Sequence, residues 1–169
     1  IYERVETISG PASVLHGEGS IVGAVDYVPR RPSPDQAETD VLMSAGSFNT
    51  SRVAAGHGGP TGIDGLSFRI DGERQSSDGY PDNADMRRDS LSGSLRYDAS
   101  DRLTLTGNLI YIDDELAPYY GAPVLTDLGE PPDDFRRSNF NARDASIKGE
   151  EFRLTLDADY LMSESVQLR

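Results

Sequence analysis

Apolar and polar residues alternate along most of this chain, which is the period of a β-strand and not of a helix. The clearest run is 90–97, where Leu91, Leu95 and Tyr97 alternate with serines and Arg96. Further runs, two of them weak and the last incomplete, lie at 66–73, 103–111, 151–160, 40–46, 51–58 and 165–169. The pattern predicts an all-β fold of about seven strands.

Three features of these runs favour a membrane barrel over a soluble sandwich. The runs reach about 9–12 residues, the length that a tilted strand needs to cross a bilayer. Their polar faces are rich in charge, as the lumen of a barrel is. Tyr97, Tyr111 and Tyr160 fall at strand ends, where the aromatic girdles of membrane barrels lie.

The connections between the runs alternate in length. Short ones at 58–64, 98–101 and 161–164 alternate with long ones at 76–87 and 113–148. This matches short periplasmic turns and long extracellular loops, and it places the acid pair Asp113–Asp114 in a loop. The short connection 47–49 is an exception to the rule. Because seven strands leave two open edges, we expect either more strands beyond the chain or a piece of a larger barrel.

Composition narrows the function classes. The chain has 169 residues, a formal net charge of -13 and no cysteine, and it begins at Ile1 without an initiator methionine. The acidic balance argues against nucleic acid as a partner, since no basic stripe is present to neutralise phosphates. The lack of cysteine excludes disulfides and cysteine metal sites. We expect a fragment of a processed, exported protein.

The first 32 residues carry the most specific motif. They predict a compact strand–turn–strand unit that packs against something larger, followed by a polar linker at 33–37. The motif positions are Glu3-Arg4-Val5-Glu6, Gly10-Pro11, Ser13, Leu15, Gly17, Gly19, Gly23, Val25 and Arg31-Pro32. This stretch resembles the end of the plug domain of TonB-dependent outer-membrane receptors, in the siderophore (ferrichrome-type) branch. It departs from the family pattern at His16, Asp26 and Pro29 and in having one glycine at Gly23 where a pair is usual.

The resemblance implies a fragment of a 22-stranded antiparallel transmembrane β-barrel, with residues 1–32 as the C-terminal part of the plug and 33–169 as the first barrel strands. It implies a receptor in the outer membrane of a Gram-negative bacterium that imports a ferric siderophore and does no covalent chemistry. The implied partners are the TonB–ExbB–ExbD energy-coupling system and outer-membrane lipid. No resident cofactor or metal site is expected.

Ligand-binding candidates come from the two long connections. Residues 117–123 resemble the Tyr-Tyr-Gly loop of ferric hydroxamate receptors, which implies ligand contacts from Tyr119 and Tyr120. Tyrosines suit a chelate with an apolar rim and polar oxygens, because each ring buries area and keeps a hydroxyl. Tyr80 is a second aromatic candidate, and Arg87, beside Arg88, is placed to attract an anionic chelate. Loop packing is the alternative role for these tyrosines.

A plug–barrel contact is the remaining site hypothesis. Arg4 and Glu6 share one side of the first predicted strand, and by resemblance a plug arginine pairs with a barrel glutamate. The alternative is a plain surface ion pair.

Other chemistry finds little support in the sequence. The glycines of 17–23 are one residue too widely spaced for a dinucleotide fingerprint, and His16 and His57 belong to no metal or catalytic motif. Three other functions stay open: a TonB-dependent importer of cobalamin, haem or sugar, a passive porin-like barrel, and a soluble all-β enzyme or carbohydrate-binding module. The plug motif argues against the second, and open sheet edges argue against the third.

Overall fold

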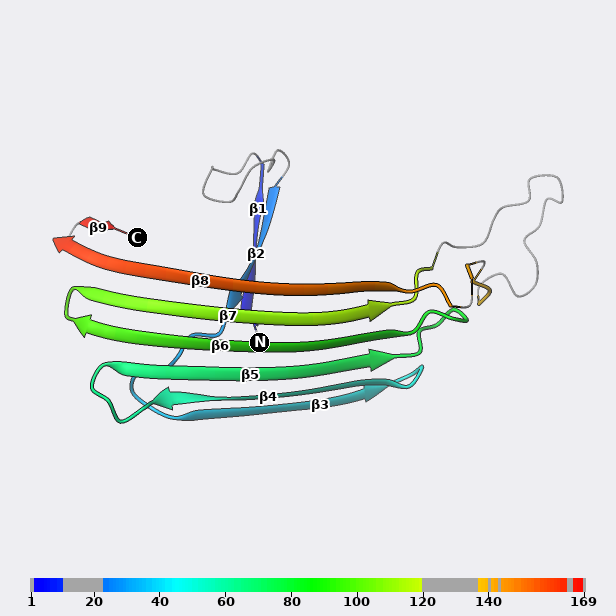
Figure 1. Ribbon diagram of the computed structural model, residues 1–169, viewed down its shortest axis with the longest axis horizontal. Coiled ribbons are helices and arrows are strands. Elements are labelled where there is room, and N and C mark those ends of the chain that lie inside the picture. Colours follow the sequence, from blue (N-terminus) through cyan, green and yellow to red (C-terminus); the bar gives the residue numbers. More distant parts are fainter. Residues whose placement is uncertain are drawn as a thin grey trace.

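The computed structural model describes residues 2–10, 23–119, 137–139, 141–142, 144–163 and 166–168, which form nine β-strands in two sheets (Figure 1). No helix within these ranges is long and apolar enough to cross a membrane. The smaller sheet is an antiparallel hairpin of β1 (Tyr2–Ser9) and β2 (Gly23–Pro29). The larger sheet contains β3 (Glu38–Gly46), β4 (Thr50–Pro60), β5 (Leu66–Ser77), β6 (Met86–Ser100), β7 (Leu103–Leu116), β8 (Ile147–Ser163) and β9 (Val166–Leu168).

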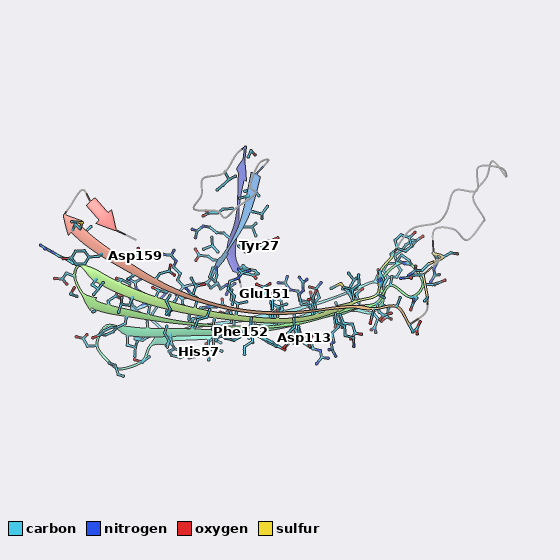
Figure 2. The ribbon with its side chains drawn as sticks, turned by 45° about the horizontal axis from the view of Figure 1, so that its top comes forward. Tyr27, His57, Asp113, Glu151, Phe152 and Asp159 are labelled. Carbon is cyan, nitrogen blue, oxygen red and sulfur yellow. The ribbon has the colours of Figure 1, made fainter. Side chains whose placement is uncertain are left out.

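The larger sheet is an antiparallel meander in which each strand pairs with the next in the chain. Its strands have between 9 residues, in β3, and 17 residues, in β8, apart from the three-residue β9. The sheet is curved, and the β1–β2 hairpin lies on its concave side and crosses its strands (Figures 1 and 2). We call the concave, hairpin-side face of β3–β8 the inner wall and the opposite face the outer face.

The polar side chains of this sheet are buried and its apolar side chains are exposed, the reverse of a soluble sheet. In β5, the inward Ser67, Arg69 and Asp71 are 1%, 3% and 5% exposed, whereas the outward Ile70 is 56% exposed. Figure 2 shows the same sorting in β8, where Glu151 points to the hairpin side and Phe152 to the other side. A soluble sheet buries its apolar face, so this arrangement suits a sheet with lipid outside and polar surroundings inside.

The turn between β3 and β4 is tight. Phe48 and Asn49 have φ angles of 59° and 51°, and the Thr50 amide donates to the Ser47 carbonyl at 3.2 Å. Two successive left-handed residues match the twist of a two-residue hairpin, although a bulky residue such as Phe48 rarely adopts this conformation. The Asp78 amide donates to the Phe48 carbonyl at 2.9 Å, which holds the strained residue in place.

The alternation predicted the strands of the larger sheet correctly, but the expected loop boundaries are wrong. Asp113 and Asp114 belong to β7 and Lys148 to β8, not to a loop. Ion pairs between strands explain the difference, because they let charged residues extend the ladder. Arg87 of β6 reaches Asp113 at 3.5 Å, and Lys148 reaches Glu115 of β7 at 3.2 Å.

Candidate functional site

A groove of about 710 Å³ separates the hairpin from the inner wall. On the hairpin side it is bounded by Tyr2 and Tyr27, whose ring centroids are 5.2 Å apart. On the wall side it is lined mainly by inward-facing residues, which include Asp40, Leu42, Arg52, Gly56, Asp71, Glu73, Gln75, Arg88, Ser90, Ile112, Asp114, Glu151 and Arg153. About half of the lining residues carry charge, with both signs present, so the groove suits water and polar solutes.

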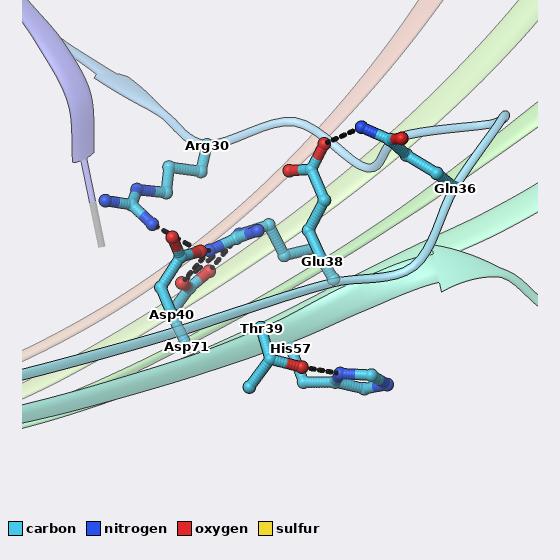
Figure 3. A network of polar contacts seen from close by, with 8 residues as sticks. Arg30, Gln36, Glu38, Thr39, Asp40, His57 and Asp71 are labelled. Atoms are coloured by element: carbon cyan, nitrogen blue, oxygen red, sulfur yellow. Dashed lines mark hydrogen bonds and ion pairs between the residues drawn. The ribbon is translucent and has the colours of Figure 1, made fainter.

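A charged cluster joins the chain leaving β2 to the inner wall (Figure 3). Arg69 donates from Nε and a terminal nitrogen to Asp71 at 2.8–3.2 Å, and from the same terminal nitrogen to Asp40 at 2.7 Å. Arg30, directly after the hairpin, pairs with the same Asp40 oxygen at 2.7 Å. Asp40 therefore connects a buried wall arginine to an arginine of the segment that leaves the hairpin. Planar guanidinium groups favour such multiple carboxylate contacts.

Gly56 of β4 makes room for this cluster. It lies between Asp40 and Asp71 in the strand register. A Cβ atom on Gly56 would lie 2.1 Å from Asp71 Oδ1 and 2.8 Å from a terminal nitrogen of Arg69. The arginine reaches β3 from β5 only because β4 presents no side chain at this point.

Three further ion pairs cover the inner wall toward the long-loop end. Arg52 binds Glu73 through two hydrogen bonds of 2.8 and 2.9 Å. Arg88 donates to Asp114 at 3.4 Å, and Arg153 donates to Glu151 at 2.5 Å. Each of these pairs is neutral overall and keeps this part of the wall hydrophilic.

The structure separates the predicted ligand residues. Tyr80 lies in the β5–β6 connection and packs edge-on against Phe48, with ring centroids 5.5 Å apart. Tyr119 follows β7 and is 46% exposed, and Tyr120 lies outside the described residues. Arg87 is on the outer face, where Asp89 and Asp113 are its carboxylate partners, while Arg88 is on the inner wall. Ligand contacts from these residues stay predictions, and the outward position of Arg87 argues against its part in an internal site.

Arg4 and Glu6 lie together on β1, as expected for a strand. Arg4 donates to Glu6 at 2.6 Å and to Glu3 at 3.3 Å, all on the same strand. The hydrogen bond with Glu6 raises the pKa of Arg4 above its ordinary value. A contact between Arg4 and the wall stays a prediction.

No motif in the sequence marks the cluster of Arg30, Asp40, Arg69 and Asp71 as a unit. The alternation does place Arg69 and Asp71 on one polar face. The pairing of Arg69 with Asp40, 29 residues away, follows from strand register, which composition and periodicity do not fix.

Comparison with known proteins supplies the family. No family model matches the chain. It is 30% identical over 122 residues to the ferric-pyoverdine M114 receptor PbuA of Pseudomonas sp. strain M114, covering 72% of this chain and 15% of that receptor. It is 29% identical over 174 residues to the metal-pseudopaline receptor CntO of Pseudomonas aeruginosa, covering 94% of this chain and 24% of that receptor. The chain thus spans less than a quarter of the length of these relatives.

Solved structures agree on the fold. The ferripyoverdine receptor of the Pseudomonas aeruginosa outer membrane, bound to ferripyoverdine, matches 95% of this chain and 22% of its own, with a TM-score of 0.82 and 22% identity. The ferric-catecholate import receptor Fiu of Escherichia coli K12 matches 98% of this chain and 27% of its own, with a TM-score of 0.86 and 17% identity.

This chain belongs to the TonB-dependent siderophore receptors. Its seven-stranded sheet corresponds to part of a receptor barrel and is not itself a closed barrel. Receptors of this family are transport proteins of the Gram-negative outer membrane and are not enzymes. The charged inner wall and the apolar outer face have the polarity expected of the lumen side and the lipid side of a receptor barrel.

Proposed function

We propose that the chain is part of an outer-membrane receptor that actively imports a ferric siderophore. The observation that carries the proposal is the separate hairpin joined to the inner wall through Arg30 and Asp40. A passive porin keeps its lumen open for diffusion, whereas this hairpin lies across the concave side of the sheet (Figure 1). The arrangement supports a plugged barrel that needs energy to open.

Residues 1–32 form the end of the plug in this proposal, and residues 33–169 begin the barrel. The β1–β2 sheet pairs with no strand of the larger sheet among the described residues. Between β2 and β3 the chain runs through the non-strand segment 30–37. The hairpin can therefore move relative to the wall without breaking a strand ladder, once Arg30 leaves Asp40.

A ferric siderophore is the proposed cargo because the relatives are named for pyoverdine, pseudopaline and ferrichrome. In this scheme, Tyr80 and Tyr119 meet the chelate at the long-loop end, and the Arg88–Asp114 pair offers polar groups on the inner wall below them. TonB–ExbB–ExbD supplies the energy that displaces the plug, and outer-membrane lipid surrounds the outer face.

The test is uptake of radioiron carried by purified siderophores, with ferrichrome and ferripyoverdine as the first two probes. Iron-starved cells that carry or lack the full-length gene are compared, each with and without a working Ton system. We expect uptake of one chelate that requires both the gene and the Ton system.

Other results would contradict the proposal in distinct ways. Gene-dependent uptake that persists without the Ton system would indicate a passive pore. Absence of uptake for every ferric chelate, with Ton-dependent uptake of cobalamin, haem or a sugar, would retain the receptor class and change the cargo.

A further inference from the structure

A cluster of asparagines ties together the two connections that carry the candidate tyrosines. Asn139, from the β7–β8 connection, donates through Nδ2 to the Asn83 carbonyl at 2.7 Å and to the Pro118 carbonyl at 3.2 Å. Its Oδ1 accepts from the Asn141 amide at 3.1 Å. Both amide hydrogens and the amide oxygen of this one side chain are therefore in use.

Two more side-chain hydrogen bonds complete this contact between the β5–β6 and β7–β8 connections, which we call the junction. Asn83 donates through its own Nδ2 to the Ala142 carbonyl at 3.1 Å, and Asn141 donates to the Pro118 carbonyl at 3.4 Å. Backbone bonds run in parallel, from the Ala117 amide to the Asp85 carbonyl at 2.8 Å and from the Asp82 amide to the Arg137 carbonyl at 2.6 Å. The β5–β6 connection thus holds both ends of the β7–β8 connection, at 117–118 and at 137–142.

The Pro118 carbonyl gives this junction a specific consequence for Tyr119. The ring of Pro118 fixes its φ angle. Two asparagine amides hold its carbonyl oxygen, which fixes the rotation of the Pro118–Tyr119 peptide plane. Ala117, directly before it, is only 5% exposed. The buried Ala117 and the held carbonyl of Pro118 together fix the direction of the backbone at Tyr119.

Asn83 contributes a conformation that few other residues adopt easily. Its φ angle is 54°, in the left-handed region that asparagine tolerates better than most residues with a side chain. This conformation turns the Asn83 carbonyl toward Asn139 while its side chain reaches Ala142. Asn83 thus contributes both its hydrogen bonds and its left-handed turn conformation to the junction.

We propose that Asn139 is a positioning residue that sets the direction of Tyr119 for ligand binding. Asn139 acts through the Pro118 carbonyl and does not itself touch the ligand. A neutral amide is required, because an aspartate would place negative charge against two carbonyl oxygens and lose both donors. The ligand-binding part of this inference rests on the proposed function, whereas the placement of Tyr119 does not.

The first measurement is backbone hydrogen exchange in the full-length receptor in its lipid environment. We expect Asn139→Ala to speed exchange of the Ala117 amide about tenfold, since the loss of two donors loosens the junction. Asn139→Asp should do the same. Asp144→Ala, at an exposed position of the same connection, is the matched control and should change nothing.

The second measurement is a double-mutant cycle on the affinity of the full-length receptor for ferripyoverdine and for ferrichrome. We expect Asn139→Ala to weaken binding about tenfold in the wild-type background and less than twofold in a Tyr119→Ala background, because the two residues act as one unit. Asn141→Ala removes the weaker 3.4 Å bond to the Pro118 carbonyl and the bond that Asn141 Oδ1 accepts from the Ala142 amide at 2.9 Å, and it should weaken binding by a smaller factor. The heat stability of the barrel should stay unchanged in all of these variants.

Two results would overturn the inference. One is unchanged exchange at Ala117 in Asn139→Ala. The other is an equal loss of affinity with and without Tyr119, which would separate Asn139 from that residue. A receptor that binds no ferric chelate would refute the proposed cargo, while the exchange measurement still decides whether Asn139 holds the junction.

Discussion

The inner wall and the outer face are made by the same strands, yet they follow opposite rules. In β5, Arg69 and Asp71 are nearly inaccessible, and Ile70 between them is more than half exposed. The inward residues are surrounded by partners from β3 and from the segment after β2, while the outward residue has no polar partner to satisfy. The environment on each side, and not the strand, decides which residue type is stable there.

Glycines make the same contrast without any side chain. Gly56, on the inner wall, lies where a Cβ atom would collide with the carboxylate of Asp71. Gly93, on the outer face, has no atom within 4 Å of the position of its missing Cβ. One glycine is required by a close approach, and the other faces open space that lipid fills. Substitutions at matched inward and outward positions should therefore change the free energy of unfolding by different amounts, or in opposite directions.

The largest difference should come from Asp71→Ala. This change leaves the Arg69 guanidinium buried with only Asp40 as a carboxylate partner, and it should lower the free energy of unfolding by about 3–5 kcal/mol. The measurement is urea unfolding of the full-length receptor in detergent. Ile70→Ala is the outward control and should cost clearly less. An equal loss of unfolding free energy in the two variants would mean that the buried ion cluster stabilises the receptor no more than an exposed apolar side chain does.

A smaller difference should separate arginines placed on the two faces of β8. Leu156 is 77% exposed near the middle of the outer apolar band, so Leu156→Arg should cost about 2–4 kcal/mol in a lipid bilayer. Thr155→Arg, one residue earlier and facing inward, should cost less than about 1 kcal/mol. Refolding into lipid vesicles followed by denaturant titration compares the two. A greater cost for the inward arginine would reverse the assignment of the faces.

The sequence predicts much of the contrast between the two faces. Where it fails, the failure has a physical cause. Period-two alternation gave the strands of the larger sheet and put Arg69 and Asp71 on a polar face. It failed at Asp113 and Lys148, where charge suggested a loop and ion pairs between strands extended the ladder. Alternation states which face a residue occupies, but register decides which residues meet across strands.

The loop residues pose a different problem. Residue type and resemblance made Tyr80 and Tyr119 candidates for ligand binding, and that role stays a prediction. Asn139 had no signal, because an asparagine in a loop is common and carries no periodicity. Its importance lies in two carbonyls at positions 83 and 118 that come together only after folding. Sequence patterns predict surfaces well, and they predict the contacts that position a binding residue poorly.

The smallest difference should come from the matched glycines themselves. Gly56→Val places branched carbons against Asp71 and Arg69, and it should cost about 1–3 kcal/mol as the pair is forced apart. Gly93→Val enters open space on a strand, where a β-branched residue is preferred, so its effect should be neutral or stabilising by up to about 1 kcal/mol. Unfolding of both variants under one set of conditions gives the comparison. A destabilised Gly93→Val beside an unaffected Gly56→Val would show that the inner cluster rearranges freely and that the outer face is the more tightly packed side.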